Sequence, residues 1–209
     1  VTLSAEDVKT ALMIIQKCNF YLIVHGKYLY NFCRPGKSIQ WQVKLLQSEL
    51  SEAQKIMADV IIHQGKNLKE LGLSKEEAHQ NFADNVSSVL QTSIDTTNLI
   101  ILENSCRQGT ECGYSLDDLF DIYKRLDSGI INRIGFCIDL CHIFVAGELD
   151  VRDVGSVKAW FDRFDQKIGI DKLKVIHFND SDTDFNGAND NHGSIGTGYI
   201  GRVSTKGME

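Results

Sequence analysis

The sequence has 209 residues and a formal net charge of −6, with 43% hydrophobic and 24% charged residues. This size allows one sizeable core and at most two domains. The mildly acidic charge gives no global electrostatic case for nucleic-acid binding, and no apolar run approaches the ~20 residues that a membrane-spanning helix needs. No charged-then-apolar signal segment opens the chain, so we expect an intracellular protein, a monomer, whose six cysteines are reduced.

One unit recurs along the chain: a helix with apolar spacing, followed by a nearly continuous apolar strand. The predicted helices cover residues 8–15, 43–57, 76–93, 115–126 and 157–168. The predicted strands cover residues 20–26, 59–65, 99–104, 134–139 and 173–180. Apolar strands that alternate with helices indicate a parallel sheet covered by helices.

Each predicted strand ends in a polar residue able to bind a metal ion, at intervals of roughly 38 residues, the length of one strand, one helix and two loops. An open doubly wound sheet would spread these residues along an edge. They converge on one point only if the sheet curls, which predicts the α/β fold of a (β/α)8 TIM barrel. Because five such strands are found, we interpret residues 1–209 as one domain, a partial barrel that lacks the first two strands and the last.

The stretch Ile134–Leu149 combines a buried strand with two candidate ligands. Asp139 stands at the end of the strand, and His142 follows three residues later, where we expect a loop to start. A carboxylate and a neutral imidazole so placed are a standard pair of divalent metal ligands. The alternative is an aspartate that caps the next helix beside a surface histidine. Cys137 and Cys141 are interpreted as packing residues.

Five of the six histidines lie at or just beyond strand ends, and only His79 is interpreted as an ordinary solvated helix residue. The candidate metal ligands are His25, His63, Glu103, Asp139, His142, His177, Asp190 and His192. Imidazole and carboxylate without thiolate suit zinc, with manganese or iron as alternatives. Eight ligands are too many for one ion, so we expect two or three, an arrangement common in phosphodiester hydrolysis.

Several separated motifs carry a family resemblance. They are ILEN at 101–104, GFCIDLCH at 135–142, HFND at 177–180, DNH at 190–192 and GTGYIG at 196–201. In this order and spacing they resemble the endonuclease IV family, the zinc-dependent apurinic/apyrimidinic endonucleases. Members of this family act in base excision repair, cut double-stranded DNA on the 5′ side of an abasic site, and clear blocked 3′ ends.

The resemblance implies a TIM barrel with three zinc ions. His25 and His63 would hold one ion, and the catalytic Glu103 would bridge it to a second ion on Asp139 and His177. The third ion would be held by His142, Asp190 and His192. Tyr28 matches an aromatic residue that the family inserts into the duplex. Asn104 and Asn179 stand beside ligands, and we expect them to orient the ligand carboxylates.

The sequence also departs from the family pattern. Gln64 replaces a proline, Leu140 a small hydroxyl residue, Asp182 a lysine, and Asn191 a basic residue. The family's last metal-binding glutamate, on the eighth strand, has no counterpart in this sequence.

Two alternatives remain open. The first is a sugar isomerase or epimerase of the xylose-isomerase-like barrels, in which the group of His142, Asp190 and His192 would have no purpose. The second is a truncated, non-catalytic barrel that binds metal or DNA without cutting.

Overall fold

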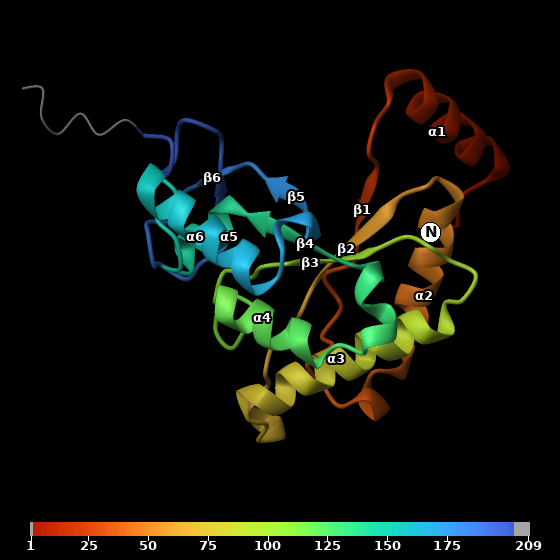
Figure 1. Cartoon of the computed structure of the whole chain (residues 1–209), viewed down its shortest axis with the longest axis horizontal. Coiled ribbons are helices and arrows are strands. Elements are labelled where there is room, and N and C mark those ends of the chain that lie inside the picture. Colours follow the sequence, from red (N-terminus) through yellow and green to blue (C-terminus); the bar gives the residue numbers. More distant parts are fainter. Residues whose placement is uncertain (1, 203–209) are drawn as a thin grey trace, which may run out of the picture.

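A computed structural model describes residues 2–202 of the chain. Its centre is a five-stranded parallel sheet with the order β1-β2-β3-β4-β5 (Figure 1). The strands are β1 (Ile23–His25), β2 (Asp59–His63), β3 (Ile100–Glu103), β4 (Ile134–Asp139) and β5 (Leu173–His177). Strands that follow one another in sequence are neighbours in space throughout. A doubly wound sheet reverses its strand order at a switch point, whereas the wall of a barrel does not.

The longer helices are α1 (Ala5–Cys18), α2 (Gln40–Lys55), α3 (Lys75–Thr92), α4 (Leu116–Arg125) and α6 (Val154–Lys167). Short 3-10 helices cover Gly36–Ser38, Lys69–Leu71, Ser128–Arg133 and Ile170–Lys172. Helices α2, α3 and α4 lie side by side along one side of the sheet (Figure 1). Local sequence fixes where several helices begin, because α1 and α3 each start with a capping box, from Ser4 with Asp7 and from Ser74 with Glu77.

The alternation of side chains along the strands separates two apolar layers. Val60 and Ile62 of β2 pack toward the helices in the main core, together with Leu46 of α2 and Phe82 of α3. A second cluster lies on the opposite face of the sheet. It contains Ile61, Ile101 and Cys137, with Ile23, Leu99 and Val175 packed against it. This second cluster is the packed interior of the barrel wall.

The same alternation positions the candidate ligands. Each strand-end residue stands two positions after a member of the interior cluster, as His63 does after Ile61 and Glu103 after Ile101. Since successive side chains point to opposite faces of a strand, residues two apart share a face. His25, His63, Glu103, Asp139 and His177 therefore all project from the concave face, just beyond the apolar layer.

The structure corrects several sequence-based predictions. The first strand has three residues rather than seven, and the last ends at His177. Asp180–Ser181 instead forms β6, which pairs with β7 (His192–Gly193) as a small antiparallel sheet. The prediction that His142 lies in a loop is wrong. It belongs to a short helix, α5 (Leu140–Val145), because the carboxylate of Asp139 caps this helix and accepts the backbone N–H of His142 at 2.8 Å.

The prediction that His79 is solvated is also wrong, since this residue of α3 is only 1% exposed. Its Nδ1 lies 2.9 Å from a carboxylate oxygen of Asp121 on α4, and this partner makes its burial possible. Among residues 2–202, none of the helices combines the length and apolar character required to cross a bilayer.

Candidate metal centre

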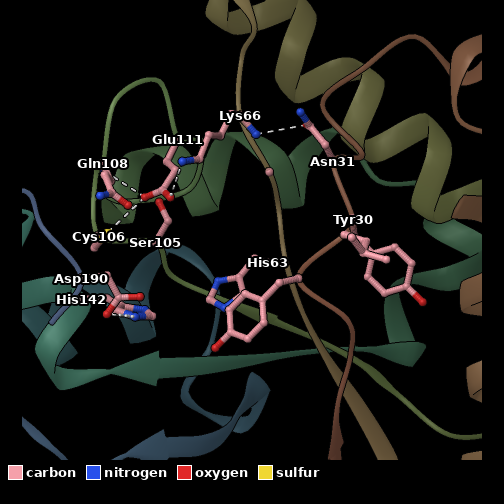
Figure 2. A pocket seen from close by; sticks show the side chains of 13 residues that line it. Tyr30, Asn31, His63, Lys66, Ser105, Cys106, Gln108, Glu111, His142 and Asp190 are labelled. Atoms are coloured by element: carbon pink, nitrogen blue, oxygen red, sulfur yellow. Dashed lines mark hydrogen bonds and ion pairs between the residues drawn. The ribbon is translucent and has the colours of Figure 1, made fainter. Parts of the chain in front are cut away.

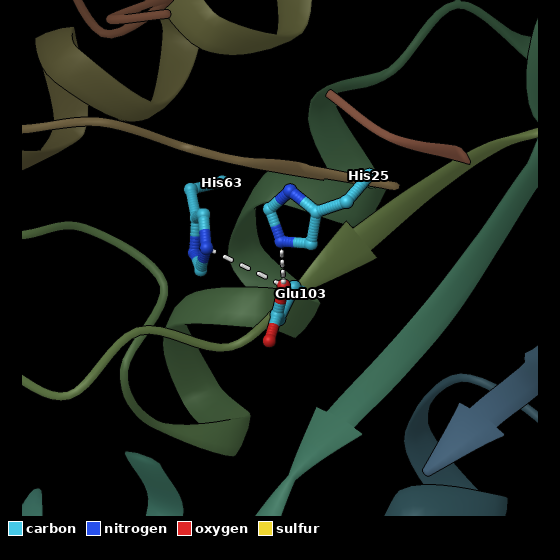
Figure 3. A group of neighbouring side chains, drawn as sticks. All are labelled: His25, His63 and Glu103. Atoms are coloured by element: carbon cyan, nitrogen blue, oxygen red, sulfur yellow. Dashed lines mark hydrogen bonds and ion pairs between the residues drawn. The ribbon is translucent and has the colours of Figure 1, made fainter. Parts of the chain in front are cut away.

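Glu103, at the end of β3, is the centre of the site and is 1% exposed. Its Oε2 atom lies 3.2 Å from Nε2 of His25 and 3.4 Å from Nε2 of His63. Figure 3 shows both imidazoles directed at this carboxylate. Its Oε1 atom is directed elsewhere and lies 2.7 Å from Nδ1 of His177. Oε2 of Glu103 thus faces His25 and His63, and Oε1 faces His177. A ligand that bridges two metal ions needs its two oxygens divided in this way.

The second group joins Glu103 to the ends of β4 and β5. Nδ1 of His177 is also 3.5 Å from a carboxylate oxygen of Asp139, which is fully buried. Hydrogen bonds from His177 to the Asp139 and Glu103 carboxylates raise the pKa of His177 to about 12. A divalent cation bound here would replace that proton as the partner of the two carboxylates.

A third group lies between α5 and β7. Nε2 of His142 and Nε2 of His192 are 3.3 Å apart, and they lie 3.3 Å and 3.0 Å from Oδ1 of Asp190. The other ring nitrogen of His142 hydrogen-bonds the backbone carbonyl of Asn104 at 2.9 Å. This contact fixes the ring so that Nε2 faces Asp190, as is usual for histidines that bind metals.

The donor atoms fit divalent ions. Nε2 of His63 is buried and has no hydrogen-bond partner among residues 2–202. Burial lowers the pKa of His63, so its imidazole is neutral, the form that binds metals. A cation between this nitrogen and the buried carboxylate of Glu103 would satisfy both. The structure thus brings all eight predicted ligands into one candidate metal centre.

Two thiols also lie near these ligands. Cys137 falls within ligand-binding distance of Glu103 and His177, and Cys141 within that distance of Asp190 and His192. Both were predicted to be packing residues, and both are buried. Burial raises the pKa of each thiol, to about 11 for Cys141, so in this structure they are protonated and are poor ligands.

Asn104 and Asn179 both hold Asp139, but in different ways. Asn179 donates to the Asp139 carboxylate at 2.7 Å and accepts from the backbone N–H of Cys141 at 2.8 Å. Asn104 contacts only the Asp139 backbone, accepting from its N–H at 2.7 Å and donating to its carbonyl at 3.2 Å. Asn179 therefore orients the carboxylate, and Asn104 positions the strand end.

Asp180 has a structural role that was not predicted from the sequence. It is 1% exposed, and its carboxylate accepts backbone N–H groups from five residues. These residues are Ser181, Gly196, Gly198, Ile200 and Gly201. The carboxylate folds the glycine-rich segment into a fixed turn beside β6. Four of these five residues follow Asp180 by 16 to 21 positions, so no local sequence pattern signals the bonds.

A cavity of about 400 Å³ opens beside the ligands. His63, His142 and Asp190 form one side, and Lys66, Ser105, Gln108 and Glu111 the other (Figure 2). Tyr28 stands at its mouth, 80% exposed, with its ring centroid 5.2 Å from that of His25. The residues of the second side could not be predicted from the sequence, because they come from loops without a recognisable motif.

The strand order and the ligands at the carboxyl ends of the strands define a TIM-barrel protein with a candidate metal centre. Residues 1–205 match the family described as a xylose isomerase-like TIM barrel. The chain is 36% identical over 196 residues to the putative endonuclease 4 of Acanthamoeba polyphaga mimivirus. It is 31% identical over 202 residues to the probable endonuclease 4 of Chloroflexus aggregans. The chain belongs to the endonuclease IV family.

These matches cover most of this chain but a smaller share of each relative. The alignment with the mimivirus protein covers 91% of this chain and 62% of that protein. The alignment with the Chloroflexus protein covers 95% of this chain and 68% of that protein. Among solved structures, endonuclease IV from Thermus thermophilus superposes with a TM-score of 0.78 at 21% identity. That superposition covers 96% of this chain and 69% of the Thermus chain, and it confirms the barrel fold.

Proposed function

We propose that this chain carries the metal centre of a DNA-repair endonuclease. Its substrate would be double-stranded DNA with an abasic site, cut on the 5′ side of the lesion, with removal of 3′-blocking groups as a related activity. One observation supports this best: one oxygen of the Glu103 carboxylate faces His25 and His63, and the other faces His177. A separate group of donors lies around Asp190.

The candidate ligands fall into three groups, one for each proposed ion. We propose that His25, His63 and Glu103 hold one zinc ion, that Glu103, Asp139 and His177 hold a second, and that His142, Asp190 and His192 hold a third. Manganese or iron are the alternatives for this donor set. When bound, such ions lower the pKa of water and stabilise negative charge on an attacked phosphate.

The remaining side chains shape the site. Asn179 fixes the Asp139 carboxylate, so that the ligand needs little reorganisation. Tyr28 presents an exposed ring beside His25, where it would stack on a base or fill the space of a missing one. An abasic nucleotide lacks stacking and is therefore easier to turn out of the duplex than a normal one. The cavity beside His63 and His142 would receive it.

The decisive experiment uses a duplex with one abasic-site analogue, incubated with the chain and zinc, with a chelator, and with Glu103→Gln. We expect a single metal-dependent cut on the 5′ side of the lesion that Glu103→Gln abolishes. Glu6→Gln, at an exposed carboxylate of α1, should cut as the unchanged chain does.

Other outcomes separate the alternatives. Binding of metal and DNA without a cut would indicate a non-catalytic barrel. Metal-dependent interconversion of ketose sugars without DNA cleavage would indicate an isomerase or epimerase. Either result would overturn the proposal.

A further inference from the structure

The loop between β6 and β7 (residues 182–191, the ligand loop) carries Asp190, and His192 follows it directly. This loop contains no helix or strand, and most of its residues are exposed. Oδ1 of Asp190 nevertheless lies 3.3 Å from Nε2 of His142 on α5 and 3.0 Å from Nε2 of His192. The third group of candidate ligands therefore forms only if the ligand loop keeps one position against α5.

Two backbone hydrogen bonds attach the ligand loop to α5. The N–H of Asn186 donates to the carbonyl of Phe144 at 3.2 Å, and the N–H of Ala188 donates to the carbonyl of Val145 at 2.8 Å. These carbonyls lie in the last turn of α5, where they lack the partners that a further turn of helix would supply. The ring of Phe185 also packs against that of Phe144, with centroids 5.4 Å apart. The loop is thus held on the helix that carries one of the three candidate ligands.

The ligand loop has an unusual backbone just before Asp190. Asn186 and Ala188 have φ values of +65° and +50°. Asparagine enters this left-handed region more readily than other residues with a side chain, but alanine rarely does, because its β-carbon crowds the following carbonyl. Such a conformation persists only where surrounding contacts impose it. The path of the chain into Asp190 is therefore set by contacts with the rest of the fold.

A side chain from the loop after β3 supplies one of these contacts. Nη2 of Arg107 donates to Oδ1 of Asn186 at 2.6 Å and lies 3.5 Å from the backbone carbonyl of the same residue. The Asn186 amide also lies against Gly147, where a β-carbon would come within 2.4 Å of Oδ1. Arg107 and the bare backbone of Gly147 thus hold the Asn186 side chain in one place.

The segment that carries Arg107 is itself fixed. The preceding residue, Cys106, is 3% exposed and packs in a buried cluster with residues of α5. The following residue, Gln108, donates from its side chain to Oδ1 of Asn189 at 3.4 Å. Since Asn189 directly precedes Asp190, the loop after β3 contacts the ligand loop a second time, next to the ligand.

We propose that Arg107 is a positioning residue for the third metal position, where it acts through Asn186. A guanidinium group donates through several N–H groups in a fixed plane, so it fixes the left-handed turn at Asn186 and, through it, Asp190 and His192. His142 does not depend on this contact, because it belongs to α5. The inference rests on the proposed third metal position, but not on DNA cleavage.

The test titrates the metal-free full chain with zinc against a chromophoric chelator, and compares the unaltered chain with Arg107→Ala. We expect the third ion to bind roughly 10–100-fold more weakly in Arg107→Ala, the usual effect of losing a residue that orients a ligand. The first two ions should bind with unchanged affinity, since their ligands stand at strand ends. Cadmium NMR of the cadmium-loaded chain identifies the position: one of three resonances should be lost, while the other two keep their chemical shifts.

Further variants assign the effect to the contact between the two side chains. Asn186→Asp keeps both the acceptor and the tolerance of positive φ, so it should retain the third ion. Asn186→Gly keeps only the tolerance of positive φ and should weaken the third ion about as much as Arg107→Ala does. Combining it with Arg107→Ala should cost little more, because both changes remove one contact. Arg163→Ala, at an exposed arginine of α6, is the matched control and should bind all ions normally.

Unchanged affinity for the third ion in Arg107→Ala would overturn the inference. Equal weakening at all three positions would also overturn it, because it would indicate a general loss of structure. An unaltered chain that binds only two ions would overturn the third metal position itself. This last result concerns the unaltered chain alone, so failure of the proposed site is distinguished from failure of the role of Arg107.

Discussion

Oε1 of Glu103 lies 2.7 Å from Nδ1 of His177, although these residues end strands that are not neighbours in the sheet. Strand β4 lies between β3 and β5, and in a flat sheet their backbones would be about 9.5 Å apart with parallel side chains. The contact therefore depends on the curvature of the sheet, which tilts side chains on the concave face toward one another. The candidate metal centre is a consequence of this curvature.

Glu103→Gln should reduce the metal content of the chain. The variant keeps the size of the side chain but loses the charge that faces His25, His63 and His177. We expect a loss of about one to two of the three proposed ions, because a carboxylate shared by two positions supports both. Metal per chain, measured after gel filtration in metal-free buffer, checks this. An unchanged content would contradict the role of Glu103 as a bridging ligand.

The two asparagines that hold Asp139 should have separable effects. Asn179→Ala removes the donor to the Asp139 carboxylate and should weaken zinc binding by roughly 10–100-fold. Asn104→Ala removes buried bonds to the Asp139 backbone and should lower the free energy of unfolding of the metal-free chain by about 1–3 kcal/mol. Zinc titration and urea unfolding distinguish them. Equal losses of zinc affinity and of unfolding free energy in the two variants would refute the separate roles of Asn179 and Asn104.

Asp180→Asn should destabilise the chain by about 2–4 kcal/mol, because one buried, charged acceptor serves five backbone N–H groups. The amide also turns one acceptor into a donor that faces other donors. Urea unfolding of the metal-free chain measures the effect. Asp182→Asn is the control, since Asp182 is exposed. A cost equal to that of the control would show that the glycine-rich turn is held by other contacts.

Tyr28→Ala should weaken binding to a duplex with an abasic site by roughly 5–100-fold, the usual effect of one stacked aromatic side chain. The ring is exposed and packs on imidazoles at the site, so the fold should not change. Tyr28→Phe should bind normally if stacking is what matters. Fluorescence anisotropy at fixed salt measures both. A loss in Tyr28→Phe as large as in Tyr28→Ala would point to the hydroxyl instead.

Asp121→Asn should destabilise the chain at neutral pH but not in strong acid. Arg125 and His79 lower the pKa of Asp121 to about 2 against the effect of burial. Because the pKa falls on folding, the stabilisation is present above the unfolded value of about 3.9 and is lost as the pH falls through about 2. We expect about 1–2 kcal/mol at pH 7, reduced by the partial exposure of the pair.

Urea unfolding of the wild type and Asp121→Asn between about pH 6 and pH 2 would follow this difference. A chelator present throughout prevents metal release from contributing. A difference that stays constant over the whole range would show that the carboxylate stabilises by packing rather than by charge.

The alternation of helices and apolar strands, and the ligands at the strand ends, could be predicted from the sequence because they depend on local periodicity and spacing. The match to the family and the superposition on the Thermus structure confirm the barrel fold. The boundaries of β1 and β5 could not be predicted, since pairing with a neighbour decides where a strand ends. Helix α5 was missed because six residues carry too little periodicity to reveal a helix.

The sequence by itself determined the fold class and the identity of the eight candidate ligands. Only the tertiary structure decided which of them share a carboxylate, that Asn179 and not Asn104 holds the side chain of Asp139, and that His79 is buried beside Asp121. The physical reason is that these contacts join residues on different strands and helices. Their distances depend on sheet curvature and helix packing, which no stretch of sequence specifies alone.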